Sequence, residues 1–343
     1  MKKLLLAVFS IATTFSLYAQ REVPQERMEQ IYEEVKTPYK YGLAVAPADN
    51  YHKIDCPTVF RQGDKWLMTY VVYNGKGGTD GRGYETWIAE SDNLLEWRTL
   101  GRILSYRDEK WDCNQRGGFP ALPDMEWGGS YELQTYKGRH WMTYIGGEGT
   151  GYEAVKAPLY VGLAWTKGDI STAHEWESLD KPILSIHDKD AQWWEKLTQY
   201  KSTVYWDKDK TLGAPFVMYY NAGGRHPETD LKGERVGIAL SKDMKTWKRY
   251  SGNPVFAHEA DGTITGDAHI QKMGDVYVMF YFSAFEPSRK YKAFNTFAAS
   301  YDLVNWTDWK GADLIIPSKN YDELFAHKSY VVKHDGVVYH FYC

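Results

Sequence analysis

A tryptophan recurs at similar intervals along this chain, each time after a small residue, an acidic residue and a short spacer. The four copies read Ser91-Asp92…Trp97, Gly168-Asp169…Trp176, Ser241…Asp243…Trp247 and Ser300…Asp302…Trp306. The tryptophans are 79, 71 and 59 residues apart, and an alternating apolar stretch precedes each copy. A repeat of this length, made of about four strands, is typical of one blade of a β-propeller.

A second repeated element sets the number of units. Five aromatic-rich strands are predicted over 66–70, 141–144, 216–220, 278–281 and 338–342. Four of them follow a short turn that contains glycine, the usual signal of a β-hairpin. The chain is therefore predicted to be all-β, with a five-bladed propeller over residues 39–343.

The fifth unit ends after its second strand. Residues 41–46 resemble the predicted third strands at 160–164 and 236–239. We expect this N-terminal strand to close the ring, because closure would remove an open sheet edge. The alternative is that the sequence lacks the last strands of the fifth unit.

The first 19 residues have the pattern of a secretory signal peptide. Lys2 and Lys3 precede an apolar run over 4–17, and Ala19 is a small residue at the predicted cleavage point. The run is too short for a membrane span, so we expect a periplasmic or secreted protein without one. Residues 20–38 are polar and predict a short amphipathic helix before the propeller.

Composition narrows the classes of partner. The net charge is −4 without a long basic run, which argues against nucleic acid. The chain holds 14 Trp and 27 Tyr, enough both to fill the space between sheets and to bind sugars.

Propeller geometry divides the polar residues between two faces, because chain direction alternates from strand to strand. The tryptophan-ending turns lie on the far face, where Asp92, Asp169, Asp243 and Asp302 are expected to brace turns through backbone amides. The starts of the first strands, the loops between second and third strands, and the connections between units lie on the near face.

The starts of the first strands carry charges that differ from unit to unit. Aligned on the second strands, these segments are 54–58, 200–203, 266–269 and 326–329, and in the second unit 129–130. Their charged and histidine residues are Asp55, Lys201, Asp267, His269, His327 and Lys328. Isolated charges are costly at a narrow channel, so this cluster predicts a functional site. The alternative is a structural ring of ion pairs around water or an ion.

Other near-face residues are candidates for substrate binding. Glu126 and Glu148 are reserve acids, and Trp127 and Trp194 could stack on sugar rings. Lys201 and Lys328, with Arg225 and Arg116 on nearby loops, would favour an anionic group on the substrate.

Two short motifs resemble a known group of enzymes. Asp55-Cys56-Pro57 resembles the Asp-Pro of five-bladed propeller glycoside hydrolases of families 43, 32, 117 and 130. Gly-Asp-Ala-His-Ile at 266–270 occupies the place of Glu-Gly-Pro-His-Ile in family 43. The resemblance implies that Asp55 is a general base. Family 117, which uses a late carboxylate and a fifth-blade histidine acid, would match Asp267 and His327.

The sequence departs from family 43 at two positions. Tyr200-Lys201 stands where that family has an acid, and its fourth-blade glutamate is absent. Hydrolysis needs one group to protonate the leaving oxygen and another to activate water. We therefore expect His327 or a near-face carboxylate to be the acid.

The expected function is an exported glycoside hydrolase acting on an oligosaccharide from a plant, algal or host polysaccharide, with an anionic sugar as one candidate. Two alternatives stay open, a phosphorylase that uses phosphate instead of water and a non-catalytic carbohydrate-binding propeller. No cofactor is required, and calcium in the central channel is a candidate structural ion.

Overall fold

The computed structural model describes residues 22–74, 81–153 and 157–343. The predicted signal peptide lies outside these residues. Within them the chain is mostly β-structure, with a single α-helix, α1 (Gln25–Val35), and short 3₁₀ turns η1 (Trp193–Glu195), η2 (Pro287–Arg289) and η3 (Asn320–Asp322). No described helix is long and apolar enough to cross a membrane.

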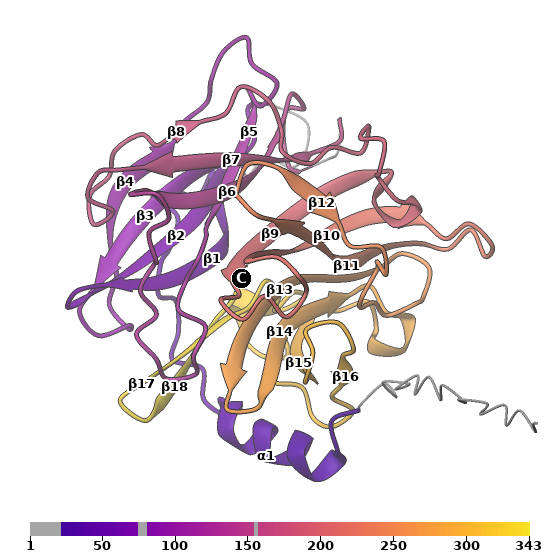
Figure 1. The fold of residues 1–343 in the computed structure, drawn as a ribbon. Coiled ribbons are helices and arrows are strands. Elements are labelled where there is room, and N and C mark those ends of the chain that lie inside the picture. Colours follow the sequence, from indigo (N-terminus) through magenta and orange to yellow (C-terminus); the bar gives the residue numbers. More distant parts are fainter. Residues whose placement is uncertain (1–21, 75–80, 154–156) are drawn as a thin grey trace, which may run out of the picture.

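Sequential antiparallel strands form five groups around a common centre (Figure 1). The first group is β1 (His52–Gln62), β2 (Lys65–Asn74), β3 (Glu85–Ser91) and β4 (Arg98–Leu104); the second is β5 (Gln115–Pro120), β6 (His140–Gly147), β7 (Tyr160–Thr166) and β8 (Glu177–Ser178). The third is β9 (Thr198–Trp206), β10 (Phe216–Arg225), β11 (Lys232–Ser241) and β12 (Trp247–Arg249); the fourth is β13 (Thr263–Met273), β14 (Val276–Ala284), β15 (Phe294–Ser300) and β16 (Thr307–Asp308). The fifth is the hairpin β17 (Tyr330–His334) and β18 (Val337–Phe341).

Apolar side chains join each group to the next, and the fifth to the first. Separate buried clusters link the first and second groups, the second and third, and the third and fourth. A further cluster joins the fourth group to Val331 of the fifth, and another packs Tyr330 and Val332 against Val59 and Met68 of the first. The groups are thus arranged in a ring by burial of apolar surface.

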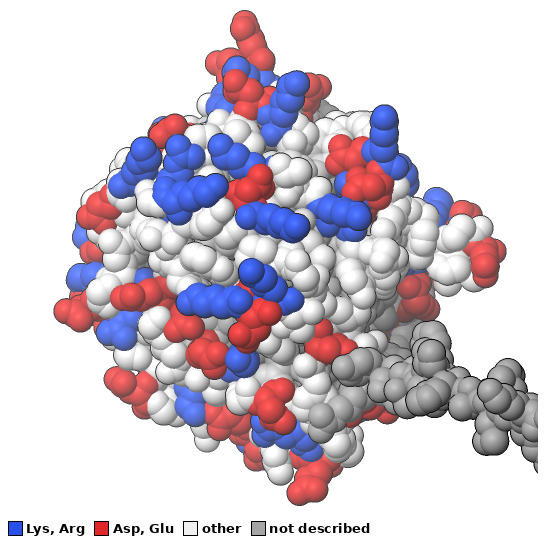
Figure 2. Space-filling view, viewed as in Figure 1, with Lys and Arg blue, Asp and Glu red and all other residues white. Residues whose placement is uncertain are grey.

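Helix α1 covers the outside of the fourth group. Its apolar stripe of Met28, Ile31 and Val35 is fully buried and packs in one cluster with Val278 and Phe280 of β14. The spacing of three and four residues places these side chains on one helix face. Acidic and basic side chains alternate over the face of the molecule shown in Figure 2.

The inner strand of the second group differs from the prediction. It is β5, not the segment around 129–130. Residues 121–139 instead cross the far ends of the other inner strands, through backbone hydrogen bonds with Arg61, Val204 and Lys272 and a bond from the Lys333 N–H to the Tyr131 hydroxyl. The segment satisfies backbone groups that would otherwise be orphaned, and it covers the far end of the channel.

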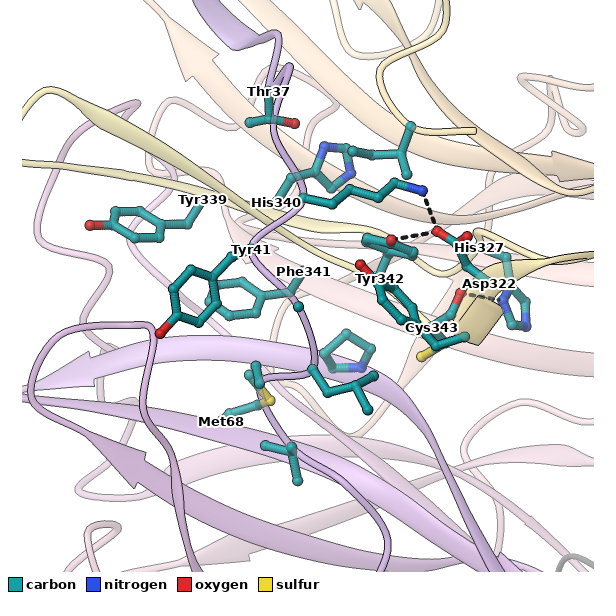
Figure 3. Close-up of a pocket in the computed structure, with 18 of the residues that line it drawn as sticks. Thr37, Tyr41, Met68, Asp322, His327, Tyr339, His340, Phe341, Tyr342 and Cys343 are labelled. Atoms are coloured by element: carbon teal, nitrogen blue, oxygen red, sulfur yellow. Dashed lines mark hydrogen bonds and ion pairs between the residues drawn. The ribbon is translucent and has the colours of Figure 1, made fainter. Parts of the chain in front are cut away.

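The strand predicted over 41–46 is not formed, so ring closure by an N-terminal strand is not confirmed. Lys40 ties this segment to the Asp322 carboxylate and to the Ile316 carbonyl. A cavity of about 970 Å³ is lined by residues 36–47 of this segment and by the β18 region (Figure 3). Backbone pairing with β18 is therefore absent along this stretch.

The far-face turns are braced as expected, with one change of residue. Asp243 Oδ1 accepts hydrogen bonds from the N–H groups of Lys245 (2.9 Å) and Thr246 (2.8 Å). Asp302 makes the equivalent bonds. In the first group the neighbouring Asn93 makes them, and Asp92 pairs with a surface lysine instead. Asp169 braces its turn through the N–H and hydroxyl of one serine.

This difference gives a matched pair of variants. Asp243→Ala removes two charge-assisted bonds to backbone amides and should cost about 1–2 kcal/mol of unfolding free energy. Asp92→Ala should leave the melting temperature unchanged, because the interaction it removes is an exposed ion pair with Lys65. Thermal melts of both variants check this, and equal losses would contradict the turn assignment.

Candidate active site

Backbone irregularities at the starts of the inner strands direct charged side chains toward the ring centre. Non-glycine residues adopt left-handed conformations at Cys56 (φ 55°), Asp267 (φ 58°) and Lys328 (φ 57°). The first two coincide with shifts of strand register in β1 and β13. Bulges of this kind re-aim side chains, and strain of about 1–3 kcal/mol per residue is commonly held at functional sites.

Lys328 joins two carboxylates from different parts of the chain. Its Nζ lies 2.6 Å from Asp55 Oδ2 and 2.9 Å from Glu153 Oε1. Asp55 Oδ1 accepts the Cys56 N–H at 2.9 Å, so both oxygens of Asp55 are engaged. Burial alone would raise the pKa of Asp55, but the charges of Lys328 and His327 outweigh it and lower that pKa to about 2.

Glu153 lies in the loop between β6 and β7, which Gln115 holds in place. The Gln115 Nε2 donates to the carbonyls of Gly149 (2.9 Å) and Gly151 (2.7 Å), and its Oε1 accepts the Tyr84 N–H at 3.0 Å. The Tyr84 hydroxyl in turn donates to Glu153 Oε1 at 3.0 Å. Glu153 is thereby fixed by Tyr84 and Lys328 together.

Glu234 is the second glutamate near the centre, close to the start of β11. There the β11 backbone pairs in parallel with β13, with Glu234 opposite Ile264. The side chain is half-buried, lines a cavity of about 490 Å³ with Tyr200 and Phe285, and accepts a hydrogen bond from Asn221 Nδ2 at 3.1 Å.

The Glu234 carboxyl holds a proton at neutral pH. Burial is the largest cause, and the charges of Glu153 and Asp267 add to it, raising the pKa of Glu234 to about 8. The bond from Asn221 and the charge of Lys328 act in the opposite direction but do not cancel these effects. The site therefore contains a protonated carboxyl close to an ion-paired one.

Lys201 and Asp267 complete the cluster from β9 and β13. Both are buried, and Lys201 Nζ lies 3.7 Å from Asp267 Oδ2 and over the ring of Phe119. Burial raises the pKa of Asp267, although the charges of Lys201 and Lys328 oppose that shift.

The two histidines have different surroundings. His327 is half-buried beside the larger cavity, with Nδ1 3.0 Å from the Cys343 carbonyl oxygen (Figure 3). His269 is buried and stacks on Tyr330 at a centroid distance of 3.8 Å. Burial lowers the pKa of His269 to about 3, so its imidazole is neutral and packs inside the fold.

Two predicted binding residues lie away from the cluster because residues 121–139 cross the far face. Glu126 is exposed and pairs loosely with Lys272, at 3.7 Å. Trp127 donates its indole N–H to Glu34 of α1 at 2.7 Å. Neither side chain joins the near-face site.

Arg116 and Trp194 are on the predicted side of the molecule but are fully buried. Arg116 forms ion pairs with Asp112 at 3.1 Å and Glu175 at 2.8 Å. Trp194 packs against Tyr220 at a centroid distance of 5.0 Å. Both therefore support the scaffold instead of presenting a surface to a sugar.

Glu148 and Arg225 are exposed on near-face loops, outside the charged cluster. Arg225 pairs with Asp230 on its own hairpin at 3.3 Å. The structure thus brings together Asp55, Lys201, Asp267, His327 and Lys328, and adds Glu153, Glu234, Tyr84 and Asn221, which sequence reasoning missed. Both glutamates lie at or just after connections between second and third strands, the kind of position for which Glu148 was predicted.

The centre of the ring does not fit the suggested calcium ion. Among the described residues there is no group of three or more His, Cys, Asp or Glu side chains that could hold a metal. Asp55 and Asp267 face lysine ammonium groups instead, and Ca²⁺ would need several free oxygen ligands.

Solved structures similar to this chain share its fold. Two of them are 96% identical, with TM-scores of 0.93, and the alignments cover 94% of this chain and 92% of each matched protein. One is described as "Glycoside hydrolase" and the other as a complex of BT0996 and RGII. No protein-family model and no curated protein matches the chain.

More distant glycoside hydrolases show the same propeller architecture. Enzymes of families 43, 117 and 130 align with TM-scores of 0.57, 0.55 and 0.63 at 16%, 12% and 12% identity. The alignments cover 86%, 83% and 90% of this chain, and 85%, 74% and 90% of the others; the family 117 enzyme comes from Zobellia galactanivorans. These are among the families whose motifs the sequence resembles.

The raised pKa of Glu234 has a consequence for stability. Its folded-state pKa of about 8 exceeds the ordinary value of 4.5, so its contribution is fully present below pH 4.5 and is lost as pH rises toward 8. Glu234→Gln mimics the protonated form. The variant should therefore melt higher than the wild type at pH 8, and the gap should shrink at pH 4.5. A gap independent of pH in thermal melts would contradict the protonated state.

Proposed function

Since the chain belongs to the glycoside hydrolases, we propose that it is an exported enzyme that hydrolyses a glycosidic bond in RGII, with Glu234 and Glu153 as its catalytic carboxyl groups. The observation that carries the proposal is the pairing of a protonated Glu234 with Glu153, which is bound to Lys328 and Tyr84. RGII is proposed as substrate because a structure 96% identical to this chain is described as a complex with RGII.

Glu234 is suited to be the general acid. A glycosidic oxygen leaves more readily when a proton reaches it as its bond to the sugar breaks. An acid with a pKa of about 8 still holds that proton at neutral pH. The half-buried carboxyl also lines a cavity of about 490 Å³, from which a sugar can approach it.

Glu153 is suited to the second role. Its Oε1 accepts hydrogen bonds from the Tyr84 hydroxyl and the Lys328 ammonium, both of which favour a negative charge there. In that role the carboxylate either takes a proton from the attacking water or attacks the sugar carbon itself. Both routes use the same pair, and in both one water molecule is added across the broken bond.

Asp55 serves better as a support than as the base that its motif suggests. One of its oxygens accepts its neighbour's backbone N–H and the other binds Lys328, which leaves neither free to activate water. Asp55 thus holds Lys328 against Glu153. His327 is less suited to be the acid because its Nδ1 faces the carbonyl oxygen of Cys343.

The contacts also favour a neutral sugar at the bond that is cleaved. Lys328 contacts two carboxylates and Lys201 faces Asp267. Neither lysine therefore offers an uncompensated positive charge to an anionic group. Export rests on the predicted signal peptide, and we further propose that the five strand groups are five blades of one propeller.

Replacement of either catalytic carboxyl should abolish turnover without loss of the fold. Glu234→Gln and Glu153→Gln should each lower kcat on RGII by about 10²–10⁴-fold, because each removes an acid or base from the reaction. Glu148→Gln is the matched control, an exposed glutamate on the same connection as Glu153.

Sugar release from RGII measures the effect, with and without phosphate so that phosphorolysis is separated from hydrolysis. Full activity of both catalytic variants would overturn the assignment. A rate that depends on phosphate would support the phosphorylase alternative.

A further inference from the structure

Asn221 is buried between the two inner elements that meet at Glu234. It lies on β10, 3% exposed, where the β9–β10 register shifts between Tyr220 and Ala222. No residue of β9 is paired with it across that shift, while on the other side it pairs with Val236 of β11. Its side chain reaches the start of β13 on one side and Glu234 on the other.

The orientation of the Asn221 amide follows from its neighbours. The Asp267 backbone N–H lies 3.5 Å from Asn221 Oδ1, and a backbone N–H can only donate. The amide oxygen must therefore face Asp267, and the NH₂ group must face Glu234, with Nδ2 3.1 Å from Oε2.

Gly266 makes room for this arrangement. A Cβ added at Gly266 would lie 2.8 Å from Asn221 Nδ2, closer than real Cβ contacts come. Any other residue would push the amide away from its place. The strand β13 thus supplies both a donor, through Asp267, and the space, through Gly266, that hold Asn221 in position.

The donor direction decides which oxygen of Glu234 carries the proton. An oxygen that accepts an N–H bond in the plane of the carboxyl is the unprotonated one, because a hydroxyl hydrogen there would face the amide hydrogens. We propose that Asn221 is a positioning residue for the acid, which binds Oε2 of Glu234 and so leaves the proton on Oε1 for transfer to the substrate. The inference rests on the proposed role of Glu234 as acid.

The same bond has a second effect on the reaction. When Glu234 gives up its proton, the Asn221 N–H donates to a full carboxylate, and hydrogen bonds to a charged acceptor are roughly twice as strong as neutral ones. Asn221 thereby opposes the burial that raises the pKa of Glu234. Without it the acid would hold its proton more tightly and in a less defined direction.

Asn221→Leu is the direct test, because it keeps the size of the side chain and removes the donor. The Glu234 pKa should then rise by about one unit, the effect of one donor where two or three can lower a carboxylate pKa from about 4 to below 2. Gly266→Ala should give a shift in the same direction by displacing the amide. Asn295→Leu is the control, since Asn295 is a buried asparagine that donates to the Ala326 carbonyl outside the site.

The pKa can be read without substrate. Each variant is compared with the same variant carrying Glu234→Gln, and the difference in melting temperature is followed from pH 4 to pH 10. This difference should grow up to the Glu234 pKa and then stay constant. The constant region should begin about one unit higher in Asn221→Leu than in wild type, and should not move in Asn295→Leu.

Activity supplies the second readout. With RGII as the probe, kcat of Asn221→Leu should fall about tenfold to hundredfold, the scale of a misplaced catalytic group. An unmoved constant region in both Asn221→Leu and Gly266→Ala would overturn the positioning role, whatever happens to kcat. A shifted region in an enzyme whose wild type does not cleave RGII would keep that role and reject the proposed substrate instead.

Discussion

Four carboxyl groups share the centre of this ring with only two lysines. Two ammonium groups can compensate two carboxylates, and uncompensated buried charge is costly. Asp55, bound directly to Lys328, has its pKa lowered to about 2, whereas Glu234 has its pKa raised to about 8. The imbalance of charge thus produces groups with opposite protonation states side by side, which is what an acid and a base at one bond require.

The fold creates this imbalance by bringing distant segments to one point. Asp55 and Asp267 come from bulges in inner strands, Lys328 from a left-handed residue just before β17, and Glu153 from a connection held by Gln115. Each element is fixed by backbone hydrogen bonds and by apolar clusters that join neighbouring groups. The far end of the channel is covered by residues 121–139, so the charged cluster lies toward the opposite face.

Much of the scaffold could be predicted from the sequence, because it repeats. The tryptophan turns and aromatic strands define the register, and the register brings Asp55, Lys201, Asp267 and Lys328 to one place, where the structure also has them. Asn93 replaces Asp92 in one turn because the brace depends on distance from the serine and not on charge.

What does not repeat could not be predicted in this way. Glu153 and Glu234 lie in irregular connections of different length, and their roles come from contacts with Tyr84, Lys328 and Asn221 that no local pattern encodes. The inner strand β5 contains two adjacent glycines and lacks clear alternation, so its sequence does not resemble the other inner strands. The predicted strand at 41–46 is wrong because a cavity, not a backbone ladder, lies between this segment and β18.

The central claim is that Glu234 supplies the proton for cleavage. Its most direct test is the pH dependence of kcat/KM on RGII, which reports the acid of the free enzyme. An acid with a pKa of about 8 is protonated below that pH, so activity should be retained at pH 7 and fall tenfold for each further unit above pH 8. A kcat/KM that stays level through pH 9, or one that already falls between pH 5 and 6, would contradict the account.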